Sequence, residues 1–272
     1  EPDTILQAVT AQITGTDKTS LAAANAPYCT ADKEHDAVSY SPASLSGRHV
    51  IITAGPTYEP IDPVRFIGNR SSGKQGFAAA EKLAARGAKV TLISGPANLP
   101  TPHGVDRIDV ETADQMLTAC QQALPADVGL FSAAVGDWTP ETPSSVKIKK
   151  KGRPSPPDIK LKENPDIVRT IATAPNRPAL IIGFAAETNN LLENAEEKLT
   201  TKNCDWILAN PVMQNDGQSV FGADKNHVYF VTKDSTQDWT LLSKDDVATK
   251  LADEITEHFA ACAPETTAEA AE

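Results

Sequence analysis

Two similar stretches, HVIITAGP at residues 49–56 and KVTLISGP at residues 89–96, decide the fold. Each is a short apolar run that ends in Gly-Pro, which is typical of a buried strand followed by a turn. Between them, residues 73–86 form an Ala-rich segment that closes at Gly87, and glycine is common just past a helix end. A strand, a helix and a second strand in this order predict a right-handed βαβ unit with parallel strands.

The same alternation continues outward along the chain. A capping box of Thr112 and Gln115 opens one of the later helices. The predicted strands cover 105–110, 128–135, 179–184 and 206–209, the hairpin 227–232 and 239–242, and the helices 113–124, 164–172, 189–202 and 243–259. We therefore expect an α/β fold: a Rossmann-like, doubly wound, mainly parallel sheet with helices on both faces and a small β-hairpin element. Ligands of such sheets bind beyond the carboxyl ends of the strands.

The segments on either side of this core have the composition of linkers and tails. Residues 1–46 begin with EPDTILQAVTAQI, whose apolar spacing fits one helix, and continue with small and polar residues that show no period. Residues 261–272 are acidic and Ala-rich, which is typical of a disordered end. Because the chain has no initial Met and no signal pattern, we expect a fragment or a processed product. The folded domain is expected at 47–260.

The composition of the 272 residues, 40% hydrophobic and 22% charged, is typical of a globular protein. No stretch approaches the roughly 18–20 apolar residues of a membrane span, so we expect no membrane protein. The net charge of −11 disfavours nucleic acid and anionic membranes as partners. The four cysteines show no Cys-x-x-Cys spacing, which excludes a zinc ribbon and indicates a reducing cytoplasm.

A glycine- and serine-rich loop, GNRSSGKQG at residues 68–76, precedes the first predicted helix. Backbone N–H groups and the dipole at a helix N-terminus favour anions, so the loop is a candidate phosphate site. A P-loop is excluded because Gln75 stands where the P-loop has a Mg²⁺-binding Ser or Thr. A capped helix with a glycine-rich entry explains the same residues, and the loop alone leaves both interpretations open.

Polar residues also follow the strand predicted to end at residue 135. Asp137 comes directly after it, and Lys147 and Lys149 would share one side of an extended segment. Lysines beside a triphosphate stabilise the charge that builds on its leaving oxygens. A solvated basic loop is the alternative, and the two readings are about equally supported.

Three later features carry the same ambiguity. Asn164 and Pro165 read as an N-cap and first residue of a helix, which simple capping explains fully. Lys198 and Lys202 are four residues apart and share a helix face, as on many solvated helices. Phe184 ends an apolar strand, where it stacks on a base or belongs to the core.

Eight motifs, taken in order, resemble one known family. They are ITAGPTYEPIDPVRFIGNRSSGKQGFA, SGP, SAAVGDW, VKIKK, ENPDIV, IGFAAETNN, KLTTKNCD and ANPV, within residues 47–260. This sequence resembles bacterial phosphopantothenoylcysteine synthetase, in many bacteria the C-terminal half of a bifunctional phosphopantothenoylcysteine decarboxylase/phosphopantothenate–cysteine ligase. EPDTILQAV resembles the last helix of the flavin-dependent decarboxylase half. The resemblance therefore implies a decarboxylase half in the full-length protein, but no decarboxylase activity and no FMN site in this chain.

The resemblance implies a ligase of coenzyme A biosynthesis that joins 4′-phosphopantothenate to L-cysteine. The substrate carboxylate would attack the α-phosphate of CTP, giving an acyl-cytidylate and pyrophosphate. The cysteine amine would then attack the acyl carbon and release CMP. It also implies Mg²⁺, held largely by phosphate oxygens, and a homodimer whose site is completed across the interface, so that the segment from Arg65 to Asn69 and the Lys147 loop could come from different chains.

The resemblance also assigns roles to residues that match the family's motifs. Asn69 would serve the second step by binding the acyl intermediate, and Lys147 would serve formation of the cytidylate. Arg65 would lie at the site or at the dimer interface. The residues implied around the acid substrate are Arg65, Asn69, Ala133 and Ala134. The residues implied around the nucleotide are Gly55, Ser71, Gly73, Gly76, Ala133, Asp137, Lys147, Pro165, Asp166, Ile167, Val168, Phe184, Lys198 and Lys202.

Two other functions remain alternatives. An NAD(P)-binding oxidoreductase is disfavoured because the sequence has no Gly-x-Gly-x-x-Gly fingerprint and because hydride transfer needs no lysine cluster. A non-catalytic nucleotide-sensing domain would bind CTP without turnover. The residues alone do not fix CTP over ATP.

Overall fold

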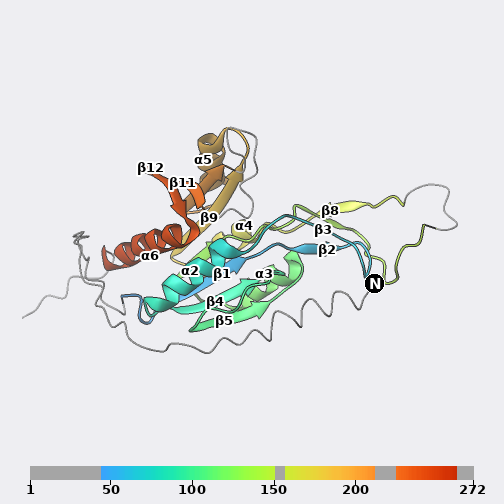
Figure 1. Ribbon diagram of the computed structural model, residues 1–272, viewed down its shortest axis with the longest axis horizontal. Helices are drawn as coiled ribbons and strands as arrows, with labels where there is room; N and C mark the ends of the chain where they lie inside the picture. Colours follow the sequence, from blue (N-terminus) through green and yellow to red (C-terminus); the bar gives the residue numbers. More distant parts are fainter. Residues whose placement is uncertain (1–43, 151–156, 212–224, 262–272) are drawn as a thin grey trace, which may run out of the picture. The chain divides into compact units, whose positions relative to one another are not determined.

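The structure is a computed structural model that describes residues 44–150, 157–211 and 225–261 (Figure 1). The helix expected at the start of the chain, most of the linker after it and the acidic tail lie outside these residues. Within the described part of the chain, no helix is long and apolar enough to cross a membrane.

An eight-stranded sheet forms the centre of the fold, in the order β12-β11-β10-β9-β6-β1-β4-β5. The strands are β1 (His49–Ala54), β4 (Lys89–Ser94), β5 (Val105–Asp109), β6 (Val128–Phe131), β9 (Leu180–Glu187), β10 (Trp206–Pro211), β11 (Lys225–Thr232) and β12 (Thr236–Ser243). From β5 to β10 the strands are parallel, in the order of the Rossmann fold, and β11 and β12 add an antiparallel hairpin. The expected fold class is confirmed.

Helices cover both faces of the sheet and bury one core on each. α2 (Lys74–Ala85) and α6 (Lys244–Ala261) share a core with Val50 and Ile52 of β1. α3 (Ala113–Gln122), α4 (Ile167–Ala172) and α5 (Leu191–Thr201) share the opposite core with Ile51. Successive strand residues point to opposite faces, so a strand buried on both sides needs an uninterrupted apolar run. This is why HVIITA lacks the alternation of a half-exposed strand.

The boundaries near the carboxyl edge of the sheet decide the shape of the site. The strand expected at 128–135 ends at Phe131, because the chain then turns and Ala134 forms an isolated parallel bridge with Pro56. The capping box of Thr112 and Gln115 is confirmed at the start of α3. The loop after β6 is therefore an irregular segment that lies against the loop after β1.

The N-cap predicted at Asn164 is wrong. α4 begins at Ile167, and its N-cap is Asp166, whose carboxylate accepts the Arg169 N–H at 3.0 Å. Asp166 supplies the cap because its carboxylate reaches the Arg169 N–H, and Asn164 stands two residues before it, outside the helix. Asn164 is therefore available for a contact outside the helix.

Two short hairpins were not predicted. One joins β2 (Tyr58–Pro60) to β3 (Phe66–Gly68), and the other joins β7 (Trp138–Pro140) to β8 (Leu161–Glu163). The first hairpin follows β1 in the chain, and the second follows β6. β2, β3 and β8 lie together beyond the parallel strands (Figure 1). Strands of three residues are too short to show a period in the sequence. We call these two hairpins, with the segment 141–150, the arm.

Candidate functional site

The crevice at the carboxyl edge of the sheet lies between β1 and β6, where the strand order reverses. The chain leaves β1 toward α2 on one face and leaves β6 toward α4 on the other. Two backbone hydrogen bonds join the loops: Ala134 N donates to Gly55 O at 2.9 Å, and Thr57 N donates to Ala134 O at 3.2 Å. Ligands of doubly wound sheets bind at such a switch point.

Buried polar side chains hold the walls of this crevice in place. Thr57 is fully buried, and its Oγ1 accepts the buried Gly136 N–H at 2.9 Å. Glu59 is 2% exposed, and its Oε1 accepts the N–H of Ala113, the first residue of α3, at 3.0 Å. Because an unpaired buried N–H is unfavourable, both side chains tie the loop after β1 to neighbouring elements.

The first cavity, of about 440 Å³, lies between the loop after β6 and the start of α4. It brings together eight residues expected around the nucleotide: Ala133, Asp137, Pro165, Asp166, Ile167, Val168, Phe184 and Lys202. Its lining also includes residues that were not predicted for the site: Thr53, Phe131, Val135, Gly136, Trp138, Glu163 and Asn164. Asp137, Glu163 and Asp166 make this cavity predominantly acidic, so it suits ligand hydroxyl and amino groups that donate hydrogen bonds.

Asn164 is the most informative of the residues that the sequence did not assign to the site. Its Nδ2 donates to Gly136 O at 2.8 Å, while its Oδ1 is buried with no hydrogen-bond partner among the described residues. A buried acceptor without a partner costs about 1–3 kcal/mol, so a ligand that supplies a donor there gains affinity. The sequence pattern indicates a helix cap at Asn164 and gives no separate sign that its side chain faces a cavity.

The second cavity, of about 150 Å³, lies at the start of α2 and shares Phe184 with the first. It contains Ser71, Gly73 and Gly76, three of the residues predicted to contact the nucleotide. None of the described residues that line it is acidic, and its lining is Arg70, Ser71, Ser72, Gly73, Lys74, Gln75, Gly76, Ser132, Ala134, Phe184, Ala186, Asn210, Asn226 and Lys244. Three cations and a helix N-terminus suit an anionic ligand group.

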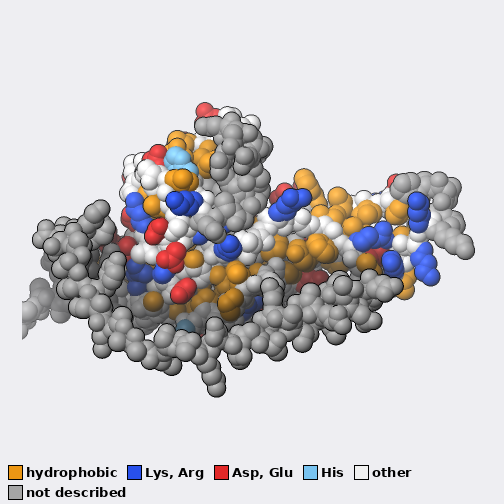
Figure 2. Space-filling model, in the orientation of Figure 1, with side chains coloured by type: hydrophobic (Ala, Val, Ile, Leu, Met, Phe, Trp, Pro, Cys, Tyr) orange, Lys and Arg blue, Asp and Glu red, His pale blue; other side chains and the backbone are white. Residues whose placement is uncertain are grey.

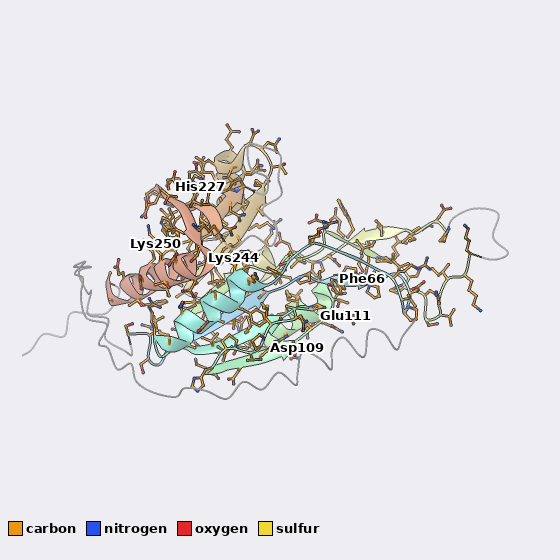
Figure 3. All side chains as sticks on the ribbon, in the orientation of Figure 1. Phe66, Asp109, Glu111, His227, Lys244 and Lys250 are labelled. Carbon is orange, nitrogen blue, oxygen red and sulfur yellow. The ribbon has the colours of Figure 1, made fainter. Side chains whose placement is uncertain are left out.

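Asn226 and Lys244 reach the second cavity from the C-terminal part of the chain. Gln75 Nε2 donates to Lys244 O at 3.2 Å, so the first turns of α2 and α6 are linked. Lys244 is labelled in Figure 3. Neither residue stands in a recognisable local motif. Lys244 comes to the site through the packing of α6 beside α2, and Asn226 comes from β11.

Two glycines near the crevice allow the backbone to pack closely. A Cβ on Gly76 would lie 2.4 Å from Ser132 Oγ and 2.6 Å from Ala54 Cβ, both of which are too close. Gly55 has a φ of 77°, and a Cβ there would lie 3.0 Å from Gly95 O. Gly55 lines neither cavity and supports the turn after β1. Gly76 allows α2 to approach the sheet at the crevice.

Asn69 lies between the arm and the crevice. Its Nδ2 donates to Val135 O at 2.9 Å, and Val135 lines the first cavity. Asn69 itself lines a third, open cavity of about 490 Å³ beside Tyr58 and Phe66, whose rings stack with centroids 3.9 Å apart (Figure 3). The exposed amide is therefore held at the edge of the crevice.

Lys147 is exposed and does not line any of the three cavities, so within one chain it is not in the same cavity as Asn69. Its segment is attached to the turn between β2 and β3. Arg65 Nη2 donates to Asp62 Oδ2 at 2.5 Å and to Ile148 O at 3.0 Å. The hydrogen bonds from Arg65 hold the pKa of the Asp62 carboxyl well below its usual range, despite burial.

Lys198 and Lys202 are held by carboxylates rather than lying on a plain solvated face. Lys198 Nζ pairs with Glu187 Oε1 at 2.5 Å, and Lys202 Nζ pairs with Asp166 Oδ2 at 3.4 Å. Lys202 lines the first cavity, and Lys198 stands one helical turn earlier on α5. A polyanion that reached either ammonium would compete with its acidic partner.

The two described cysteines belong to the core, as expected. Cys120 and Cys204 are buried, and burial raises the pKa of each thiol to about 12. A neutral thiol is a poor nucleophile and a poor metal ligand, so these residues have no part in the site.

The strand order and the crevice at the switch point define a Rossmann-like α/β protein. Residues 45–259 match the family described as the DNA/pantothenate metabolism flavoprotein C-terminal domain, and the chain belongs to this family.

Named relatives agree with this assignment. The coenzyme A biosynthesis bifunctional protein CoaBC of Haemophilus influenzae is 44% identical over 216 residues, which are 79% of this chain and 53% of that protein. A crystal structure of the C-terminal domain of CoaBC is 37% identical, with a TM-score of 0.66, and the match covers 80% of this chain and 98% of the other. The DNA/pantothenate metabolism flavoprotein from Streptococcus pneumoniae has the same fold, with a TM-score of 0.66 at 24% identity, over 78% of this chain and 99% of the other. The chain spans about half the length of the curated relatives that it matches.

Proposed function

We propose that residues 47–260 are a phosphopantothenate–cysteine ligase domain of coenzyme A biosynthesis. It joins 4′-phosphopantothenate to L-cysteine through an acyl-cytidylate and converts CTP to CMP and pyrophosphate. The observation that carries the proposal is the gathering of eight expected nucleotide residues around one cavity at the switch point. The similarity to the C-terminal domain of CoaBC supports it.

The two neighbouring cavities suit the two halves of a nucleotide. The acidic first cavity accepts hydrogen bonds from ribose hydroxyls and from a base amino group, for which Asn164 Oδ1 is a free acceptor. The basic second cavity favours phosphates or a phosphomonoester. Phe184 lines both cavities. A substrate carboxylate activated between them lies close to Asn69.

The chemistry needs stabilisation of negative charge in both steps. When the carboxylate oxygen attacks the α-phosphorus, charge builds on the phosphate oxygens and on the departing pyrophosphate. Lys147 supplies a cation for this step, brought in by the arm. When the cysteine amine attacks the acyl carbon, it loses a proton and CMP leaves with the electron pair. Asn69 holds the acyl group through its amide in this second step.

Mg²⁺ accompanies the triphosphate in this proposal. Among the described residues there is no group of three metal-ligating side chains. Mg²⁺ commonly uses phosphate oxygens and waters with one or two carboxylates, so it needs no dedicated cage of protein ligands. The ion would neutralise phosphate charge.

The test is pyrophosphate release by the purified protein with CTP, phosphopantothenate and cysteine. Sustained release should require all three substrates, and CTP should be compared with ATP at equal concentrations. Release that does not depend on phosphopantothenate would exclude the ligase. Binding of CTP without turnover would favour the nucleotide-sensing alternative. An oxidoreductase is not favoured by the family assignment.

The role split between Asn69 and Lys147 needs separate measurements. Asn69→Ala should accumulate acyl-cytidylate without cysteine transfer, whereas Lys147→Ala should form little acyl-cytidylate. Lys150→Ala is the matched control, since Lys150 is an exposed lysine three residues further along the same segment. Equal losses of both steps in both variants would refute the split.

A homodimer through the arm is part of the proposal. Of the nine exposed large hydrophobic side chains of the described residues, five belong to the arm and a sixth lies two residues before β8, and Figure 2 shows hydrophobic surface over this region. They are Val64, Phe66, Trp138, Val146, Ile159 and Leu161. Such gathered apolar surface is typical of an interaction site.

Two substitutions test this interface by light scattering. Leu161→Asp should produce monomers, whereas Leu241→Asp on β12 should leave the dimer intact. The reverse result would place the interface elsewhere.

The decarboxylase half would precede this domain in the full-length protein, as in the bifunctional relatives. The cytoplasm is the proposed compartment, because the substrate cysteine must remain a reduced thiol.

A further inference from the structure

Asp62 lies in the turn between β2 and β3 and is buried, with its side chain 0% exposed. Its Oδ1 accepts the N–H groups of Val64 and Arg65, each at 2.9 Å, which forms the local turn. Its Oδ2 accepts Arg65 Nε at 3.1 Å and Arg65 Nη2 at 2.5 Å. A third donor reaches Oδ2 from a distant part of the chain, namely Ile148 N at 3.1 Å.

The Asp62–Arg65 pair holds both polar groups of the Ile148 residue. Asp62 accepts from Ile148 N, and Arg65 Nη2 donates to Ile148 O at 3.0 Å. Another link between the segments is Ser144 N to Ile61 O at 2.9 Å. A residue held at N and O has little freedom in φ and ψ. The directions of its neighbours in the chain are therefore fixed.

Lys147 is the residue directly before this fixed point. It is exposed, and its segment belongs to no helix or strand. A long side chain on an unfixed loop would reach its target only part of the time, and misplacement by about 1 Å can reduce a rate about a hundredfold. The Asp62 carboxylate is buried while the Arg65 side chain is 47% exposed, and an ion pair that is open to water on one side usually adds little stability.

We propose that Asp62 is a positioning residue, which together with Arg65 clamps Ile148 and so directs Lys147 toward the reacting phosphate. The inference rests on the proposed ligase function. Asp62 does not contact substrate, and it acts on acyl-cytidylate formation through Lys147.

A double-mutant cycle tests this role. Single-turnover formation of acyl-cytidylate is measured for the wild type, Asp62→Asn, Lys147→Ala and the double variant. Asp62→Asn should slow this step by about tenfold to a hundredfold in the wild-type background and less than about twofold in the Lys147→Ala background. Equal effects in both backgrounds would overturn the proposal. Asp158→Asn, which changes an exposed carboxylate nearby in the sequence, should change neither rate.

A second readout separates positioning from loss of the fold. Amide hydrogen exchange of residues 144–150 should accelerate in Asp62→Asn, while exchange of β1 and β6 stays protected. Unchanged exchange at 144–150 would overturn the clamp whatever the activity. If Asp62→Asn does not fold, Arg65→Lys, which lacks the guanidinium fork to Ile148 O, should show the same selective loss. A wild type without ligase activity would instead refute the proposed function.

Discussion

Replacing Thr57 by Val removes one hydroxyl from the wall of the crevice and leaves the shape of the side chain nearly unchanged. Thr57 is fully buried, and its Oγ1 accepts the buried Gly136 N–H at 2.9 Å. In Thr57→Val this N–H loses its acceptor, which costs about 1–3 kcal/mol of folding free energy. For a domain of this size each kcal/mol lowers the Tm by about 2–4 °C, so the Tm should fall by about 2–12 °C.

Thr57→Ser is the matched control, because it keeps the acceptor and loses only a methyl group. That loss costs about 1 kcal/mol, so stability alone does not separate the two variants. Amide hydrogen exchange separates the two variants. Protection of residues 133–137 should be lost in Thr57→Val and retained in Thr57→Ser. Equal protection in both variants, with a urea midpoint of Thr57→Val like that of the wild type, would refute the role of the hydroxyl in holding the cavity wall.

Three further perturbations have defined outcomes. Gly76→Ala should lower stability by about 1–3 kcal/mol, since the new Cβ would lie 2.4 Å from a side-chain oxygen of the crevice; an unchanged urea midpoint would contradict this. Asp166→Ala should lower the free energy of unfolding by about 1 kcal/mol, because α4 loses its N-cap, and Asp166→Asn should keep most of that stability. Equal thermal unfolding of the two variants would show that the cap is unimportant. The depressed pKa of Asp62 contributes stability that is fully present above its unfolded pKa of about 4 and is lost as the pH falls below it. Asp62→Asn should therefore be less stable than wild type at neutral pH and lose less stability on acidification below about pH 4, and parallel pH profiles would argue against the pairing.

The sheet could be predicted from the sequence because strands buried on both faces carry uninterrupted apolar runs. HVIITA and KVTLIS are such runs, and their predicted bounds match β1 and β4. The arm could not be predicted in this way. Its strands are three residues long, and their pairing depends on segments far apart in the chain, such as Trp138 with Glu163.

The candidate site was predictable where its residues follow strand ends within a local motif. Residues of both ENPDIV and SAAVGDW line the first cavity. The pattern around Asn164 predicts a helix cap, and this local explanation is sufficient by itself. The hydrogen bond from Asn164 to Gly136 O depends on the fold and is not visible in the sequence. Lys244 and Asp62 have no local signal at all. One depends on the packing of α6 beside α2, and the other on a hydrogen bond that spans 86 residues.

A crystal structure grown with CTP and phosphopantothenate, without cysteine, is the most direct test of where the reaction takes place. Density for one acyl-cytidylate is expected at the carboxyl edge between β1 and β6, with its nucleoside against residues 165–168 and Phe184 and its acyl group near Asn69. Nucleotide bound at any other surface, with this crevice filled only by water, would contradict the assignment of the site.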